Sequence, residues 1–442
     1  MTADLHTRDT SFRRRFLTMT YIAAGLIGAG MGIAVLFRTK YEWTQVYVPA
    51  GARLLAGQDL YPWNTPFRYP PFTAAIAIAF AWMPIWLSNL VFHLISFGAM
   101  IVVIRWSWRI AGGGSLPHGQ QEFKREIWIA ILAILCALRF SFNALSHGQS
   151  DLLTALALTG GTLALVRGRS VLAGICWGVG AAIKGPPLLL IGYLFWRGRM
   201  LGAIAMLITF LAVSMLPDLI VRPSSGKIWL GVWADQFFQP LLRPQHEMGT
   251  WAAGLLDNQS IAGAANRWLT KSARFEDNTI LFSQRPDAVG PATLKAIVYG
   301  TYALLAIIAA IVMWPPFRSL KRRSENDGSV VRESLIHPYA WEVAIAFCLI
   351  LLVSPQSSRA HFGILLLPAM CLARVAVISR DRVARISLFT AIALSLISYN
   401  LSPIAMVNRV ALYLAFVTLT TFSLLIGCCW MRWKERQLTG NH

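Results

Sequence analysis

The residues best suited to chemistry stand where long apolar runs of the chain are interrupted. Lys184 lies within such a run, beside a Pro-Pro pair that frees backbone groups, and a cation at a broken helix suits a phosphate group. After a later run, Arg359 can bind phosphate with two hydrogen bonds, and His361 can donate to a phosphate oxygen or a leaving group. The structural alternatives are that Lys184 extends its side chain to the membrane interface and that His361 has no chemical role.

Glu42 and Asp59 are the carboxylates of the polar stretch 41–72, and either could act as a general base. Glu42 lies among three aromatic residues that could stack on a sugar, and partial burial there would raise its pKa. Asp59 follows a Gly-Gln pair, a context typical of a turn or a helix cap. We therefore predict Glu42 as the base, with Asp59 as the alternative. An acid elsewhere, such as Asp257, or no base at all, also stays open.

A third polar break, His147-Gly148-Gln149, joins two apolar runs and is followed by Asp151. Glycine permits a close approach of the backbone, and the amide of Gln149 can both donate to and accept from sugar hydroxyls. The structural alternative is that these residues cap the free backbone groups at two helix ends.

These residues are positioned by membrane helices, because the chain is 56% hydrophobic and only 14% charged. Its apolar runs have the length that spans a hydrocarbon core, which predicts an all-α, multi-pass membrane protein. The net charge of +20 comes from short basic clusters between the runs. That pattern marks cytoplasmic loops and excludes nucleic acid as a partner. The six cysteines have neither metal-site nor disulfide spacing.

The runs divide one membrane domain into about twelve predicted spans with both termini cytoplasmic. Arg13–Arg15 precede the first span. Four basic residues flank the run that contains Lys184, so within 127–201 either the Pro-Pro break forms a re-entrant hairpin or one basic pair faces outward. The predicted parts are a first span (16–37), an outer loop (38–71), spans (72–218, including an apolar run at 72–83), a long outer loop (219–295), spans (296–431) and a cytoplasmic tail (432–442).

The sequence contains no glycine-rich nucleotide-binding loop and no Asp-x-Asp pair that would hold a divalent metal for a nucleotide-sugar. Without a cytosolic domain, a membrane-borne donor is more consistent than a water-soluble nucleotide. We also find no pair of inverted halves, the common mark of secondary transporters. Two elaborate outer loops and short inner ones favour an enzyme that acts at the outer face.

Four sequence blocks, taken in order, resemble glycosyltransferase family 87, membrane enzymes of the GT-C fold that include polyprenol-phosphate-mannose-dependent α-mannosyltransferases. No block is specific alone, but the ordered set covers most of the chain. The blocks are ARLLAGQDLY…RYPPF (52–72), GQSDLLTALAL (148–158), AGICWGVGAAIKGPPLLL (173–190), and DNQS…R (257–267) paired with the SP…H turn (354–361).

The resemblance implies transfer of a sugar, usually mannose, from a polyprenyl-phosphate donor to a hydroxyl of a glycolipid or glycan outside a bacterial plasma membrane. It implies inversion at the anomeric carbon, a carboxylate base, and neither a metal nor a cofactor. The residues that we assign to the donor phosphate or sugar are Lys184, His361, Arg359, Gln149, Arg68 and Tyr69. Those assigned to the acceptor or to loop ordering are Asn258, Gln259 and Arg267.

This chain departs from the family pattern in two places. Glu42 stands where the family has its loop aspartate, and Ser358 and Ala360 replace a tryptophan and a first histidine in the SP…H turn. The donor sugar and the acceptor therefore stay undetermined. The alternative functions are a transporter or flippase for a lipid-linked sugar, a non-catalytic relative, and a polymerase or ligase of surface polysaccharide.

Overall fold

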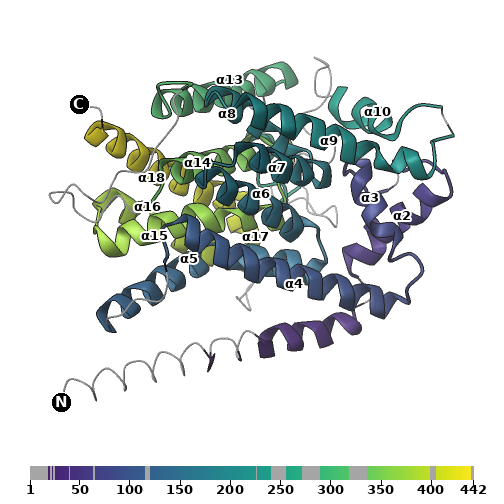
Figure 1. Cartoon of the computed structure of the whole chain (residues 1–442), viewed down its shortest axis with the longest axis horizontal. Helices are drawn as coiled ribbons and strands as arrows, with labels where there is room; N and C mark the ends of the chain where they lie inside the picture. Colours follow the sequence, from purple (N-terminus) through teal and green to yellow (C-terminus); the bar gives the residue numbers. More distant parts are fainter. Residues whose placement is uncertain are drawn as a thin grey trace.

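A computed structural model gives the arrangement of the chain, and every regular element in its described part is a helix (Figure 1). The all-α fold predicted from the sequence is confirmed for this part. The described residues are 18–19, 22, 25–38, 40–62, 65–114, 120–224, 226–239, 255–270, 289–317, 336–398 and 405–439.

The helices up to residue 238 are Gly25–Leu36, the π-helix η1 (Trp43–Tyr47), α2 (Val48–Leu55), α3 (Pro71–Ile78), α4 (Ile85–Ile110), α5 (Gln120–His147), α6 (Asp151–Val166), α7 (Ser170–Ile183), the 3-10 turn η2 (Pro186–Leu189), α8 (Leu190–Trp196), α9 (Met200–Ile220), α10 (Trp229–Trp233) and the π-helix η3 (Ala234–Phe238). Those that follow are α12 (Ile261–Leu269), α13 (Pro291–Val312), α14 (Pro338–Val353), the 3-10 turn η5 (Arg359–Leu365), α15 (Leu366–Ile378), α16 (Arg382–Ile397), α17 (Ala405–Tyr413) and α18 (Phe416–Thr439).

Six of the helices in the described part are long and apolar enough to cross a membrane. Five further apolar helices are shorter, with 10–17 residues each. The chain is a multi-pass membrane protein, whereas the predicted number of about twelve spans is not confirmed. The six long segments are 85–110, 121–147, 200–220, 291–312, 359–378 and 416–437.

Two predicted spans differ in the structure. The apolar run 72–83 forms only the eight-residue α3, which packs against α2 and turns before Pro84. At 1.5 Å per residue such a helix covers about 12 Å, too little for a crossing. The last of the predicted spans within 296–431 is divided between α17 and α18 by Ala415, whose φ of 56° lies in the left-handed region. Parts of the predicted outer loop, 240–254 and 271–288, and the basic residues at 13–15 and 318–323 lie outside the described residues.

Residues 170–199 form a hairpin. Its first and last residues both lie at the same end of the helix bundle. A Cβ added to Gly174 would meet the carbonyl oxygen of Gly202 at 2.1 Å, and one on Gly178 would meet that of Met206 at 2.6 Å. Because these contacts advance in the same direction along both helices, α7 and α9 run parallel. The chain between them must therefore reverse at the Pro-Pro break and return through α8. This geometry matches the hairpin alternative, with Arg167, Arg169, Arg197 and Arg199 at the same end.

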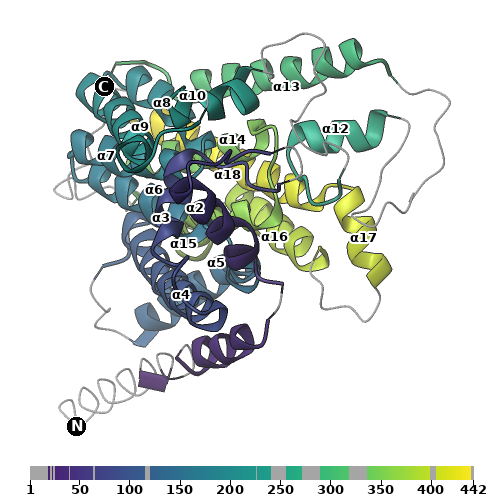
Figure 2. The ribbon, with the colours of Figure 1, turned by 90° about the vertical axis from the view of Figure 1, so that its right-hand side faces the viewer.

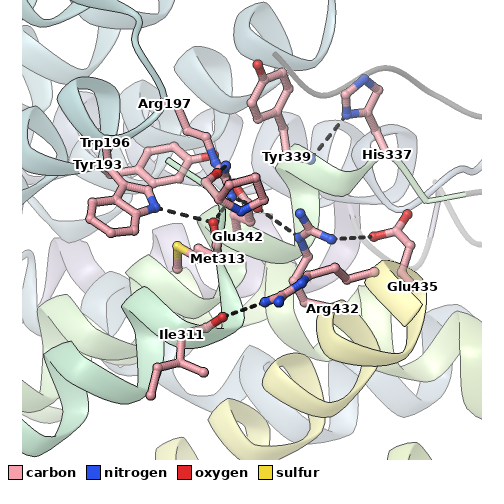
Figure 3. Close-up of polar contacts among 12 residues, drawn as sticks. Tyr193, Trp196, Arg197, Ile311, Met313, His337, Tyr339, Glu342, Arg432 and Glu435 are labelled. Carbon is pink, nitrogen blue, oxygen red and sulfur yellow. Dashed lines mark hydrogen bonds and ion pairs between the residues drawn. The ribbon is translucent and has the colours of Figure 1, made fainter. Parts of the chain in front are cut away.

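That end of the bundle holds a buried cluster centred on Glu342 of α14 (Figure 3). Arg197, which follows α8, donates from Nε to Glu342 Oε2 at 2.6 Å. Arg432 of α18 donates from Nε to Oε1 at 2.8 Å, and the Tyr193 hydroxyl donates to Oε2 at 3.1 Å. Burial makes such a carboxylate costly unless it is fully paired, so the cluster fastens α8 to α14 and α18.

The opposite end of the molecule carries the short helices. In Figure 1, α2, α3 and α10 gather at the right-hand end, beyond the first residues of α4. Figure 2 looks onto this end, with α12 and α17 to the side of α2. Short helices and turns at one end of a long-helix bundle leave room for a pocket that the helix ends surround.

Candidate functional site

A cavity of about 590 Å³ lies among these short elements and the ends of the long helices. Segments far apart in the sequence line it: the loop before η1, the start of α6, the turn after α7, η3, the segment before α12, and the turn after α14. The predicted site residues that line it are Glu42, Arg68, Tyr69, Gln149, Lys184, Asn258 and His361. The structure therefore brings most of the predicted site residues into one cavity.

Glu42 is held in the cavity by its aromatic neighbours and by Gln149. Trp43 stacks on Phe92 of α4 at a centroid distance of 3.7 Å, which fixes the start of η1. The Gln149 amide Nε2 donates to Glu42 Oε1 at 2.7 Å, and among the described residues Glu42 Oε2 receives no hydrogen bond. Burial raises the pKa of the Glu42 carboxyl, and the hydrogen bond from Gln149 opposes this increase. A carboxylate with one open oxygen is suited to accept a proton.

The His147-Gly148-Gln149 segment is shaped by its glycine. Gly148 has a φ of 71°, and a Cβ there would lie 2.5 Å from the Tyr41 ring. Only glycine fits this turn without strain, and the turn aims Gln149 at Glu42 while Asp151 starts α6. His147 does not line the cavity. Its Nδ1 lies 2.9 Å from the carbonyl oxygen of Asn143 in its own helix, α5.

Lys184 and His361 meet at Asp151. Lys184 Nζ donates to Asp151 Oδ2 at 2.7 Å, and both side chains are 7% exposed. The same ammonium lies 5.1 Å from the centre of the Tyr69 ring. His361 Nε2 lies 3.7 Å from Asp151 Oδ1. The cavity thus places a buried cation and a histidine beside one carboxylate.

The orientation of His361 follows from a backbone hydrogen bond. The Ser358 N–H donates to His361 Nδ1 at 3.0 Å, in a reciprocal cap at the start of η5. Because Nδ1 is an acceptor, the proton of the neutral ring sits on Nε2, the nitrogen that faces Asp151. His361 is therefore a neutral hydrogen-bond donor toward the cavity.

Arg359 does not line the cavity. Its Nε lies 2.9 Å from Oδ1 of Asp257, which does line it, and the two side chains are 18% and 32% exposed. Arg359 reaches the lining through its ion pair with Asp257, and its predicted contact with donor phosphate stays a prediction. Asp59 also lies outside the lining: it is exposed, and its Oδ1 accepts the Tyr61 N–H at 2.9 Å in a turn.

Asn258, Gln259 and Arg267 order the loop against the turn after α14. Asn258 Nδ2 donates to the Pro355 carbonyl at 3.2 Å, and the Gln259 N–H donates to the Ser357 carbonyl at 2.8 Å. The buried guanidinium of Arg267 donates from Nη1 to the Leu255 carbonyl at 3.0 Å. Of the two predicted roles, this geometry favours loop ordering, although Asn258 also reaches the cavity.

Arg68 and Tyr69 lie on the aromatic side of the cavity. Tyr69 stacks on Tyr47 at 4.9 Å, and the Arg68 guanidinium lies 5.5 Å from the centre of the Phe237 ring. Trp233 adds to this side, since its Nε1 donates to the Arg68 carbonyl at 3.1 Å. Flat aromatic surfaces beside polar groups are suited to a sugar ring or an apolar chain.

Sequence reasoning gave no role to Asp151 or to the aromatic residues of α10 and η3. The sequence does contain a signal for Asp151, because a carboxylate at the start of an apolar run is as costly to bury as Lys184 within one. Its pairing with Lys184 joins residues 33 positions apart and could not be read from spacing. The α10–η3 aromatics reach the cavity only through the fold.

A membrane-embedded helical bundle with a polar pocket at one end is the class that fold and site define. The sequence pattern of glycosyltransferase family 87 matches residues 67–331, more than half of this chain. The chain therefore belongs to glycosyltransferase family 87.

Two individual proteins are similar to the chain. A polyprenol-phosphate-mannose-dependent alpha-(1-2)-phosphatidylinositol pentamannoside mannosyltransferase of Mycobacterium tuberculosis (strain CDC 1551 / Oshkosh) is 28% identical over 279 residues, which are 62% of this chain and 55% of the relative. The match thus spans about half the length of that curated relative. Among solved structures, ArnT from Cupriavidus metallidurans bound to undecaprenyl phosphate has a TM-score of 0.41 at 13% identity, covering 96% of this chain and 79% of that chain.

Proposed function

We propose that this protein transfers a hexose, mannose by analogy with the mycobacterial relative, from a polyprenyl-phosphate donor to a hydroxyl of a glycolipid or glycan. The observation that carries the proposal is that one cavity holds both an accessible carboxylate, Glu42, and a separate pair of donors, Lys184 and His361. Sugar transfer from a phosphate requires these two kinds of group together.

In the proposed reaction, the acceptor hydroxyl attacks the anomeric carbon as its proton passes to Glu42 Oε2. The bond from that carbon to the phosphate oxygen breaks, and its electron pair leaves with polyprenyl phosphate. A single displacement of this kind inverts the anomeric carbon. Glu42 is half-buried and holds its other oxygen on Gln149, so its open oxygen is oriented before the acceptor arrives.

The departing phosphate gains negative charge, and we assign its stabilisation to Lys184 and His361. Lys184 has three N–H donors, of which Asp151 takes one, and His361 offers Nε2–H. These donors meet the need for charge stabilisation from the chain's own residues, so the proposal includes no metal and no cofactor. The apolar part of the lining, including Leu188, Leu189 and Phe238, suits the polyprenyl chain.

We further propose that the cavity opens on the outer face of a bacterial plasma membrane, with both termini cytoplasmic. The support is the basic residues that flank the 170–199 hairpin, which lie at the bundle end remote from the cavity. Basic loop residues are retained on the cytoplasmic side, so the cavity end falls outside.

The test is sugar transfer from radiolabelled polyprenyl-phosphate mannose in membranes that contain the full chain. Glu42→Gln keeps the size of the side chain and its contact with Gln149 but removes the base, so we expect the rate to fall by about 100-fold or more. Asp59→Asn is the matched control, because Asp59 is exposed and outside the cavity; it should retain activity. Equal transfer by wild type and Glu42→Gln would contradict Glu42 as base. Movement of the lipid-linked sugar without bond formation would contradict the enzyme.

A further inference from the structure

Asp151 lies between the two groups that the proposed function assigns to phosphate. Its Oδ2 accepts from Lys184 at 2.7 Å, and its Oδ1 lies 3.7 Å from His361 Nε2. It is the first residue of α6, directly after the turn made by Gly148, and its side chain is 7% exposed. Three segments of the chain therefore converge on one buried carboxylate.

The two carboxylates of the cavity differ in what they can do. Glu42 takes a neutral amide as partner and keeps one oxygen open among the described residues. Asp151 is bound to an ammonium and faces a histidine, and it is more deeply buried than Glu42. Both oxygens of Asp151 thus face donors of the chain, whereas Glu42 keeps one oxygen open for the proton of an acceptor.

Lys184 depends on Asp151 in turn. An ammonium that is 7% exposed is costly without a counter-charge, and Asp151 is its one carboxylate partner among the described residues. The ammonium also lies over the face of the Tyr69 ring, with Nζ 5.1 Å from the ring centre. These two contacts fix the direction of Nζ and leave its other N–H groups for a ligand oxygen.

His361 is oriented but not fully engaged. Its Nδ1 accepts from the Ser358 backbone, so Nε2–H is its only donor, and 3.7 Å is longer than a normal hydrogen bond to Asp151. A phosphate oxygen placed beside Asp151 could accept a hydrogen bond of normal length from His361 Nε2–H and a second hydrogen bond from Lys184 Nζ. The spacing of the two donors is set by the carboxylate that both of them face.

We propose that Asp151 is a positioning residue for the lipid-linked donor: it holds the Lys184 ammonium and the His361 Nε2–H at the spacing that binds the donor phosphate. This inference rests on the proposed function. Asp151 itself does not touch the reacting carbon, and the donor phosphate joins it as a second anion on Lys184.

The test uses the purified full chain in detergent and measures its thermal stability against added polyprenyl phosphate, with polyprenol as the probe that lacks phosphate. Wild type should be stabilised by polyprenyl phosphate and not by polyprenol. For Asp151→Asn we expect the apparent affinity for polyprenyl phosphate to fall about 10-fold or more, while Asp59→Asn behaves as wild type. In the transfer assay the donor KM should rise in parallel.

Each outcome has a separate meaning. If wild type is not stabilised by polyprenyl phosphate, the proposed function fails, and this inference with it. If wild type is stabilised and Asp151→Asn binds equally well, Asp151 is only structural, and this inference alone is overturned. Loss of kcat with unchanged donor affinity would make Asp151 a catalytic group and would also overturn it. Should Asp151→Asn not yield folded protein, Asp151→Ser, which leaves room for water beside Lys184, replaces it with the same expectations.

Discussion

Glu42 and Asp151 share one cavity but have different neighbours, and the neighbours decide their roles. Gln149 leaves one oxygen of Glu42 open, whereas Lys184 and His361 face both oxygens of Asp151. The chemistry at the scale of single residues therefore depends on which partner each carboxylate has.

The pKa of Glu42 gives a pH prediction. Burial raises it, and only the carboxylate form can act as base, so the rate should decline as the pH falls through this raised pKa. Gln149→Leu removes a hydrogen bond that favours the carboxylate, which raises the pKa further. The acidic decline of kcat should then move to higher pH than in wild type. An unchanged or lower position of the decline, measured across a pH series, would show that Gln149 does not tune this group.

Most of the site residues could be predicted because polar side chains at breaks in apolar runs are costly, as for Lys184, Gln149 and His361. Their partners could not. Asp151 acquires its role from a lysine in another helix, and Arg359 is taken out of the cavity lining by Asp257. Such pairings depend on how distant segments pack, which spacing along the chain does not record.

At the scale of elements, the cluster around Glu342 fastens the returning arm of the hairpin that carries Lys184 (Figure 3). α14, which holds Glu342 near its start, leads at its other end into the turn that carries His361. Two of the segments that form the proposed phosphate site are therefore joined at the far end of the bundle.

Glu342→Gln tests this connection. The change leaves two buried guanidinium groups, Arg197 and Arg432, without their shared anion, and removing one partner of a buried ion pair costs about 3–5 kcal/mol. Thermal unfolding in detergent should show this loss. Asp235→Asn, which breaks the exposed pair with Lys227, is the control and should change stability by about 1 kcal/mol or less. Similar losses for both variants would contradict the role of the Glu342 cluster.

Helices such as α4, α9 and α13 could be predicted from long apolar runs alone. The run 72–83 could not be distinguished from a span, because its apolar residues pack on α2 as well as they would on lipid. The break at Ala415 had no glycine or proline to mark it. Both differences arise where packing, rather than hydropathy, ends a helix.

At the scale of the whole molecule, the cavity and the basic residues flanking the hairpin lie at opposite ends. Asp151 starts α6 at the cavity, and Arg167 follows the end of that helix, about 24 Å away at 1.5 Å per residue. For residues 127–201 the sequence allows either a re-entrant hairpin or an outward-facing basic pair, because both agree with the hydropathy. The parallel packing of α7 and α9 matches the hairpin.

Single cysteines test the orientation. Gln58 is exposed near the cavity end, and Arg167 is exposed at the other. An impermeant thiol reagent applied to right-side-out vesicles should label Gln58→Cys directly and Arg167→Cys only after the membrane is permeabilised. The native cysteines in the unmodified chain provide the background. The reverse pattern would place the cavity on the cytoplasmic side.

If one cavity separates phosphate binding from proton transfer, donor binding and single-turnover transfer, measured in the same purified protein, should respond to different substitutions. For Glu42→Gln we expect radiolabelled polyprenyl-phosphate mannose to bind as in wild type while transfer is lost. For Lys184→Gln we expect binding itself to weaken. Transfer by Glu42→Gln at the wild-type rate, or donor binding by Lys184→Gln at the wild-type affinity, would contradict this division of roles within the cavity.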